Sequence, residues 1–287
     1  DENGSLLPKK PKNIAIILMI IFTILIILGG GIFVYMNYKR IHKFHVIITD
    51  NEDELALKAS EIISDIIKKK PNAVLSLMSG SSTSEGIYKN LIKKYKKHEL
   101  SFEGISCYHL GEYAGFSKNN EQSTYHYMYN HFYNYININQ KNLHFPDVEK
   151  DAAKGCEAYN KLLKNTHIDL QLIGLGTNGH IGFNEPGTSF DSTVHIVTLS
   201  DSVVKHSSKL FGGDTLKVPK LAITMGIKNI LSADEILLFA GGARKAEAIK
   251  ALLKGRIDPN IPVTALNKFE GTIYVVMDKE TGEEELR

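Results

Sequence analysis

The apolar residues of the chain form one long uninterrupted run followed by a series of shorter ones. Residues 14–36 contain no charged side chain, and fifteen of these 23 residues are Ile, Leu, Val or Phe. About 20 helical residues are needed to cross the hydrocarbon core of a bilayer, so a run of this length is typical of a transmembrane helix. We therefore predict a tail at residues 1–13, a transmembrane helix at residues 14–36 and a juxtamembrane linker at residues 37–43.

The residues that flank this run do not determine the orientation of the predicted helix in the membrane. A cleaved signal peptide is the alternative, but its apolar core would be shorter and would end in a small-residue cleavage site. Three basic residues precede the run and three follow it, so the positive-inside rule does not orient the helix. We expect a single-pass membrane protein. The chain starts at Asp1 rather than Met, and if a targeting segment was removed upstream, we expect the mitochondrial inner membrane.

Residues 44–287 follow a different pattern, in which short apolar runs alternate with longer amphipathic segments. Strands separated by helices predict one α/β domain with a Rossmann-like, largely parallel sheet and flanking helices. Ligands of such sheets bind beyond the carboxyl ends of the strands, so those ends are where chemistry is expected. The predicted strands are 44–49, 73–77, 105–110, 168–174, 236–240 and 272–277, and the predicted helices are 51–70, 85–97, 151–164 and 243–254.

The charge balance narrows the possible partners. The chain has 34 Lys and Arg against 32 Asp and Glu, a formal net charge of +2. A nucleic-acid partner would require a clear basic excess, so none is predicted. Only four of the basic residues are Arg, which weakens any site that would use a guanidinium group to hold an anion.

Polar, glycine-containing loops follow four of the predicted strands. Each loop alone is explained by turn geometry, but four of them at one edge of a sheet predict a ligand site. The last one opens a helix whose N-terminal amides and lysine suit an anion. The four loops are residues 79–83, 111–113, 174–186 and 241–245.

The third of these loops has the most distinctive residues. It reads Gly-Leu-Gly-Thr-Asn-Gly-His-Ile-Gly-Phe-Asn-Glu-Pro over residues 174–186. Histidine is the side chain whose charge ordinarily changes near neutral pH, and Glu185 is a carboxylate that can hold the imidazole ring of His180 in one tautomer. This pairing is typical of a general acid–base site.

The run at 174–186 closely resembles the signature of the glucosamine-6-phosphate deaminase (isomerase) family, whose fold the 6-phosphogluconolactonases share. The similarity extends over about residues 44–286, and the continuation through residues 183–186 favours the deaminase branch. It implies an aldose–ketose isomerisation coupled to loss of ammonia, which converts glucosamine 6-phosphate to fructose 6-phosphate. We expect neither a cofactor nor a metal ion. Further matches lie at residues 123–128, 218–226 and 242–246.

The resemblance also implies roles for individual residues. His180 would help to open the sugar ring, Glu185 would support it, and Asn178 stands where the family has an acidic or amide residue. The phosphate of the sugar would bind to a lysine at each of two positions and to a Gly-Ser/Thr loop. These residues are Lys209, Lys245, Ser79, Gly80, Ser81, Ser82 and Thr83.

Two parts of the implied site depart from the family pattern. Where the family has the Asp that moves the proton between C2 and C1, this chain has Gly111. Loss of a general base typically costs about 10²–10⁴-fold in rate. Glu112 is a possible substitute, but consecutive residues of a strand point to opposite sides, so it would need a backbone shift. The phosphate loop is one residue longer and gains an acidic Glu85, and Lys209 replaces a bidentate Arg.

Three functions are compatible with these residues. The one that we favour is a membrane-anchored deaminase-like protein with lost or strongly reduced catalysis, which serves as an accessory or structural subunit of a membrane complex. Soluble sugar phosphates give no reason for an anchor, whereas assembly in a lipid bilayer does. The alternatives are an active deaminase that releases fructose 6-phosphate and ammonia, and a module that binds a sugar phosphate without turnover.

Overall fold

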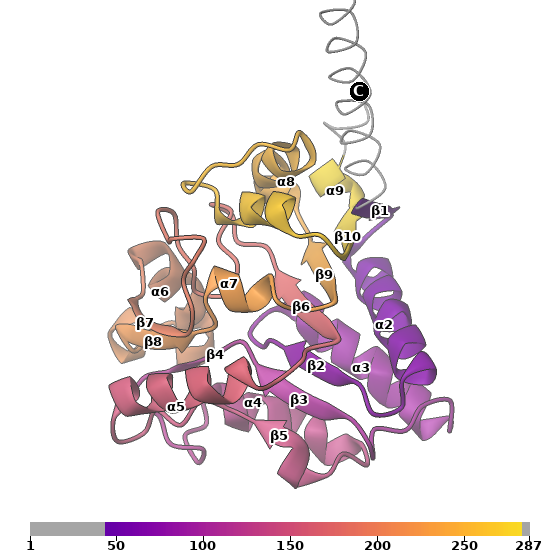
Figure 1. Cartoon of the computed structure of the whole chain (residues 1–287), viewed down its shortest axis with the longest axis horizontal. Helices are drawn as coiled ribbons and strands as arrows, with labels where there is room; N and C mark the ends of the chain where they lie inside the picture. Colours follow the sequence, from indigo (N-terminus) through magenta and orange to yellow (C-terminus); the bar gives the residue numbers. More distant parts are fainter. Residues whose placement is uncertain (1–43, 283–287) are drawn as a thin grey trace, which may run out of the picture. The chain divides into compact units, whose positions relative to one another are not determined.

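The computed structural model describes residues 44–282, which fold around a seven-stranded sheet (Figure 1). The strand order is β1-β10-β9-β6-β2-β3-β5, and the five successive pairs from β10 to β5 are all parallel. The predicted α/β class with a mostly parallel central sheet is confirmed. The strands of this sheet are β1 (Phe44–Thr49), β2 (Val74–Leu77), β3 (Ser106–His109), β5 (Leu143–His144), β6 (Leu170–Gly174), β9 (Glu235–Ala240) and β10 (Thr272–Asp278).

Helices begin where the sequence supplies caps and apolar faces. Asn51 caps α2, since its side chain accepts a hydrogen bond from the amide of Glu54. Ser81 and Ser84 form a capping box at the start of α3. The helices are α2 (Glu52–Lys69), α3 (Ser82–Lys96), α4 (Thr124–His131), α5 (Ala152–Lys164), α6 (Asp201–Ser207), α7 (Ile227–Ile230), α8 (Ala246–Leu253) and α9 (Lys279–Gly282).

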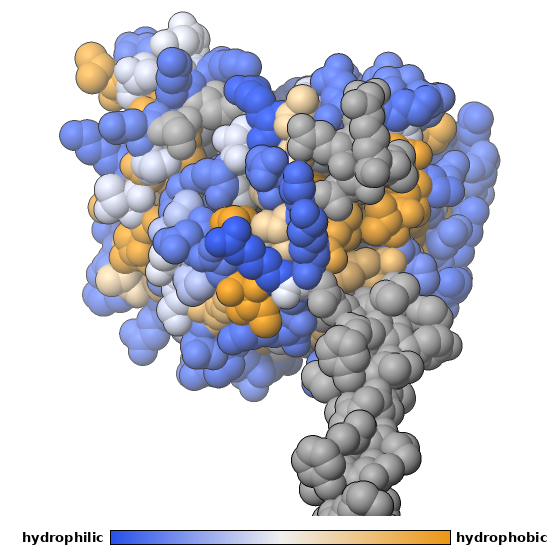
Figure 2. Space-filling model, turned by 90° about the horizontal axis from the view of Figure 1, so that it is seen from above, coloured by the Kyte–Doolittle hydropathy of each residue, from blue (hydrophilic) through white to orange (hydrophobic). Residues whose placement is uncertain are grey.

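The main core lies between one face of the sheet and the helices α2, α3 and α4. Leu55 of α2, Leu91 of α3 and Met128 of α4 are each at most 1% exposed and pack in one cluster with residues of β2, β3 and β6. Burial of this apolar surface is the main force that holds the helices on the sheet. The outer surface in Figure 2 is mostly hydrophilic, and its apolar residues form separate patches.

A second, smaller sheet was not predicted from the sequence. It consists of β4 (Gly111–Tyr113), β8 (Leu221–Thr224) and β7 (His195–Thr198), paired antiparallel in that order. Tyr113 and Phe211 lie with Ala222 in a separate apolar cluster beneath it. The third predicted strand therefore ends at His109, and the chain then enters this sheet at Gly111.

The predicted anchor lies outside the described residues. Within residues 44–282, no helix combines the length and the apolar character that crossing a membrane requires. The tail at 1–13, the transmembrane helix at 14–36 and the linker at 37–43 stay predictions.

Candidate active site

The predicted ligand loops meet at one edge of the central sheet. Strands β9, β6, β2 and β3 are parallel neighbours, so the loops that follow them leave from the same side. Direct contacts join these loops: the amide of Gly174 lies 3.0 Å from Met78 Sδ, and Lys245 Nζ donates to the carbonyl of Leu175. The topology thus brings together the loops at 79–83, 174–186 and 241–245, the last of which directly precedes α8.

Hydrogen bonds tie His180, Asn178 and Glu185 into one cluster. Asn178 Oδ1 lies 2.7 Å from His180 Nδ1, and Asn178 Nδ2 donates to Glu185 Oε2 at 2.8 Å. Because an amide oxygen only accepts, the Nδ1 of His180 must carry a proton. In the neutral ring, Nε2 is then the basic nitrogen.

The loop holds the imidazole by close backbone contact. The amide of Gly176 donates to the carbonyl of His180 at 2.8 Å, and a Cβ at Gly176 would lie 2.2 Å from the ring. Only glycine therefore fits at position 176. Asn184 Nδ2 closes the far end of the loop by donating to the carbonyls of Ile181 and Met225, each at 2.9 Å.

One carboxylate oxygen of this cluster lacks a donor. Glu185 Oε1 is buried, lies 3.6 Å from His180 Nδ1, and has no hydrogen-bond partner among the described residues. A buried carboxylate oxygen without a donor is costly, and a positive charge on the neighbouring His180 ring would offset that cost. The cluster is therefore suited to stabilising an imidazolium and to proton transfer.

Glu112 lies away from this cluster. Its side chain is 3% exposed, and its carboxylate accepts hydrogen bonds from the amides of Tyr113, Thr124 and Tyr125 at 2.8–3.1 Å. Burial raises the pKa of Glu112 in spite of these bonds. In this arrangement the carboxylate of Glu112 orders the start of α4, and its three hydrogen bonds are to the amides of Tyr113 and of that segment rather than to the loop at 174–186.

Gly111 is enclosed by neighbouring backbone. A Cβ at this position would lie 2.4 Å from the carbonyl oxygen of Ile223 and 3.3 Å from the ring of Phe183. A longer side chain cannot be added without moving β4 away from β8. Position 111 thus lacks the expected carboxylate, and this backbone conformation leaves no room for an Asp side chain there.

The hydroxyls of the predicted phosphate loop have protein partners. Ser81 Oγ accepts from the amide of Ser84 at 3.0 Å. Ser82 Oγ and Thr83 Oγ1 both donate to Glu52 Oε1 at 2.6 Å. Sequence reasoning missed Glu52, although it begins the helix that follows β1 and so lies at the same sheet edge.

The two predicted phosphate-binding lysines differ in their surroundings. Lys245 lies between the loops, where burial and the nearby Arg244 lower its pKa. Lys209 is exposed in the 3₁₀ turn Ser208–Phe211, beside the small sheet. Within the described part of the chain, no hydrogen bond or ion pair joins Lys209 to the predicted ligand loops, whereas Lys245 Nζ donates to the carbonyl of Leu175 in the loop at 174–186.

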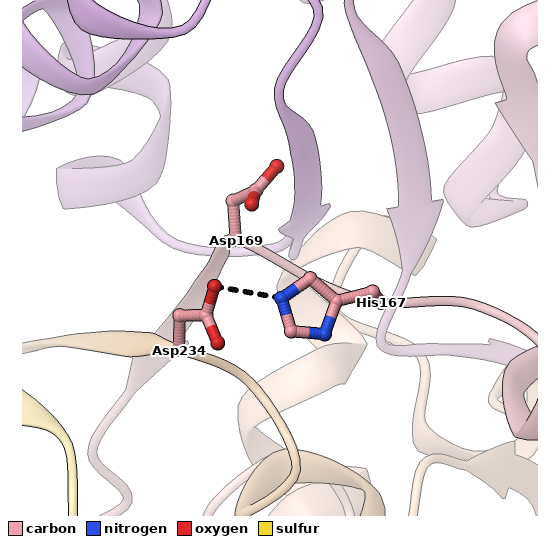
Figure 3. Close-up of side chains that lie close together, drawn as sticks. All are labelled: His167, Asp169 and Asp234. Atoms are coloured by element: carbon pink, nitrogen blue, oxygen red, sulfur yellow. Dashed lines mark hydrogen bonds and ion pairs between the residues drawn. The ribbon is translucent and has the colours of Figure 1, made fainter.

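A cluster of potential metal ligands lies at the opposite edge of the sheet. His167, Asp169 and Asp234 have ligand atoms within 4.8 Å of one another (Figure 3). His167 Nε2 lies 2.7 Å from Asp234 Oδ2, whereas Asp169 bonds to Lys70 Nζ at 2.6 Å and to the amide of Val74 at 2.7 Å. The contact between His167 and Asp234 joins the segments that precede β6 and β9. The contacts of Asp169 join the same region to β2 and to Lys70, which directly follows α2.

Comparison with known proteins identifies the family of the chain. The family described as glucosamine-6-phosphate isomerases/6-phosphogluconolactonase matches residues 49–275. The glucosamine-6-phosphate deaminase of Mycoplasma mycoides subsp. mycoides SC is 44% identical over 236 residues, which cover 82% of this chain and 94% of that protein. That of Thermoanaerobacter sp. (strain X514) is 41% identical over 237 residues, 82% of this chain and 92% of that protein.

Solved structures show the same relationship. A monomeric glucosamine-6-phosphate deaminase is 39% identical and superposes with a TM-score of 0.79, over 84% of this chain and 99% of that one. A 6-phosphogluconolactonase from Trypanosoma brucei, at 19% identity and a TM-score of 0.69 over 85% of this chain and 99% of that one, shares the fold. The chain therefore belongs to the glucosamine-6-phosphate isomerase/6-phosphogluconolactonase family.

Proposed function

We propose that this protein is a glucosamine-6-phosphate deaminase, which converts glucosamine 6-phosphate and water to fructose 6-phosphate and ammonia. The observation that carries the proposal is the cluster of His180, Asn178 and Glu185, in which Asn178 is hydrogen-bonded to both other side chains and Glu185 Oε1 lies 3.6 Å from His180 Nδ1. The identity of 38–44% to several glucosamine-6-phosphate deaminases supports the same substrate.

The cluster accounts for the opening of the sugar ring. His180 Nε2 would take the proton of the C1 hydroxyl and return a proton to the ring oxygen as the ring C–O bond breaks. Asn178 holds the ring nitrogen Nδ1, and Glu185 stabilises the imidazolium that forms in between. Lys245 would hold the phosphate at the other end of the substrate.

The proton transfer between C2 and C1 is the weak step of this site. Gly111 supplies no base, and Glu112 is bonded to the start of α4. The transfer then falls to His180 and Glu185, which also serve ring opening. We expect turnover about 10²–10⁴-fold slower than in a site with a dedicated carboxylate at position 111.

The geometry of Gly111 and Glu112 also favours a second candidate function. A protein that keeps the phosphate site and the His180 cluster but lacks the C2–C1 base would bind the sugar phosphate without isomerising it. Such a protein would be a binding or accessory subunit rather than an enzyme. Binding and turnover must therefore be measured separately.

The test uses the full chain with glucosamine 6-phosphate. Calorimetry gives the dissociation constant, and coupled assays measure the ammonia and the fructose 6-phosphate formed in equal amounts. Release that disappears in His180→Gln supports the deaminase. Binding without release above the His180→Gln background establishes the second candidate, and the absence of both binding and release removes both functions.

We also propose that residues 14–36 anchor the protein in a lipid bilayer and that the domain serves there as a subunit of a membrane complex. The support is the charge-free apolar run of 23 residues. Extraction of native membranes with alkaline carbonate tests the anchor, because an integral protein stays with the lipid. Recovery of the protein in the carbonate supernatant contradicts the anchor, and recovery from detergent only as a free monomer contradicts the complex.

A further inference from the structure

The predicted phosphate loop holds a carboxylate of its own chain. Ser82 Oγ and Thr83 Oγ1 donate to the same oxygen of Glu52, each at 2.6 Å. Thr83 is 6% exposed, so its hydroxyl is fixed toward Glu52 rather than toward solvent. Distances of 2.6 Å are typical of hydroxyls that donate to a charged carboxylate.

Polar groups of three further residues near this point also have partners within the protein. Ser81 and Ser84 bond to each other, and the amide of Gly242 donates to Asp278 Oδ2 at 2.8 Å. Burial lowers the pKa of Lys245, while Asp278 and Glu52 oppose that shift, so the field of both carboxylates reaches the lysine. A phosphate that binds here would therefore find hydrogen-bond donors that already donate to the carboxylates of Glu52 and Asp278.

From this arrangement we infer that Glu52 limits the affinity for phosphate, because it competes with the substrate phosphate for the hydroxyls of residues 82 and 83. The inference rests on the proposed function, in which this loop binds the 6-phosphate. A carboxylate and a phosphate are both negatively charged groups that accept hydrogen bonds, so they cannot share these two donors without repulsion. Binding of the phosphate therefore requires the Glu52 side chain to turn away.

A purely structural role for Glu52 makes a different prediction. Glu52 joins the first turn of α2 to the first turn of α3, and these helices pack against each other in the main core. The carboxamide of a glutamine accepts the same two hydrogen bonds without the charge. Glu52→Gln therefore keeps the link between the helices and removes only the competing charge.

Asp53 supplies a matched control. It lies next to Glu52 in the first turn of α2, is exposed, and carries the same charge. None of the hydrogen bonds among the described residues joins Asp53 to the loop hydroxyls. Asp53→Asn thus changes the net charge and the interaction with the helix dipole as Glu52→Gln does, but it leaves the Glu52 carboxylate on the hydroxyls of residues 82 and 83.

The experiment measures the dissociation constants of glucosamine 6-phosphate and of inorganic phosphate for the full chain and both variants. Glu52→Gln should bind both anions about tenfold more tightly, and Asp53→Asn should stay within about twofold of the wild type. Thermal unfolding checks that both variants are folded, which we expect because position 52 is exposed and its bonds are kept.

Failure of the inference is distinguishable from failure of the proposed function. Equal affinities in the two variants, or weaker binding by Glu52→Gln, overturn the role of Glu52. If no form binds glucosamine 6-phosphate, the proposed function falls. In that case, tighter binding of inorganic phosphate by Glu52→Gln alone still establishes that Glu52 competes for an anion site, and unchanged phosphate binding overturns it.

Discussion

Gly111 and Ile223 approach each other so closely across the small sheet that a Cβ on Gly111 would lie 2.4 Å from the Ile223 carbonyl oxygen. Backbone atoms on both sides form this contact, so the strain cannot be relieved by a change of rotamer. We expect Gly111→Ala to lower the free energy of unfolding by about 1–3 kcal/mol. Gly111→Asp, which adds more atoms, should lose at least as much in denaturant titrations.

A second glycine gives the control for this prediction. A Cβ on Gly282 would meet Ile48 Cδ1 at 3.3 Å, the end of a flexible side chain. Gly282→Ala should therefore change stability much less than Gly111→Ala. A Gly111→Asp variant as stable as the wild type would show that β4 moves easily, and the closed position of the missing base would no longer hold.

Glu185 should control turnover more than stability. In Glu185→Gln, the amide oxygen still accepts from Asn178 Nδ2, but the charge that stabilises the His180 imidazolium is lost. We expect kcat for ammonia release to fall about 100-fold with a smaller change in KM. Glu157→Gln removes an exposed carboxylate on α5 and should leave kcat unchanged. Equal effects of the two variants would argue against a role of Glu185 in the chemistry.

The sequence predicted those features that depend on local pattern. Strands β6, β9 and β10 were found within two residues of their ends because they are mostly apolar runs that are buried on both faces. His180 and Glu185 lie close together because both are in one loop, but Asn178, and not Glu185, makes the hydrogen bond to the imidazole ring. The ligand edge followed from the parallel topology, which brings the loops after β2, β6 and β9 to the same side, whereas the predicted loop at 111–113 is strand β4 of the small sheet.

The features that were missed depend on distant segments. Strand β4 has three residues, begins with Gly111, and pairs with β8 more than 100 residues away, so no periodicity marks it. The orientation of Glu112 is set by the amides at the start of α4, and the contact of Glu52 is set by the packing of α2 against α3. Side-chain directions of this kind follow from tertiary packing and leave no signal in the local sequence.

His109 should make the protein sensitive to acid. Its ring is fully buried, stacks on Phe145 with centroids 3.8 Å apart, and bonds to the hydroxyl of Tyr133 at 2.7 Å. Burial, with a smaller contribution from His144, lowers the pKa of His109 from 6.5 to about 3. The unfolded chain therefore binds the proton more readily, and stability is lost as the pH falls from 6.5 toward 3.

The comparison variant for this effect is His109→Gln, which keeps a polar partner for Tyr133 and does not titrate. The unfolding free energy of the wild type should fall relative to His109→Gln by up to roughly 1.4 kcal/mol per pH unit below pH 6.5. Denaturant titrations at pH 7, 6, 5 and 4 measure the difference. Parallel curves for the two proteins would mean that the folded protein binds the proton of His109 as readily as the unfolded chain does.

Glu112 should produce the opposite pH dependence. Desolvation raises the pKa of its carboxyl group above the ordinary value of 4.5, so the folded state binds the proton more tightly than the unfolded chain does. Its contribution to stability is then complete below pH 4.5 and is lost as the pH rises through the raised pKa. Glu112→Gln mimics the protonated form at every pH. The unfolding free energy of the wild type minus that of Glu112→Gln should therefore decrease as the pH rises from 4 to 7. An increase over this range would show that the three amide donors at Tyr113, Thr124 and Tyr125 outweigh burial and keep Glu112 ionised.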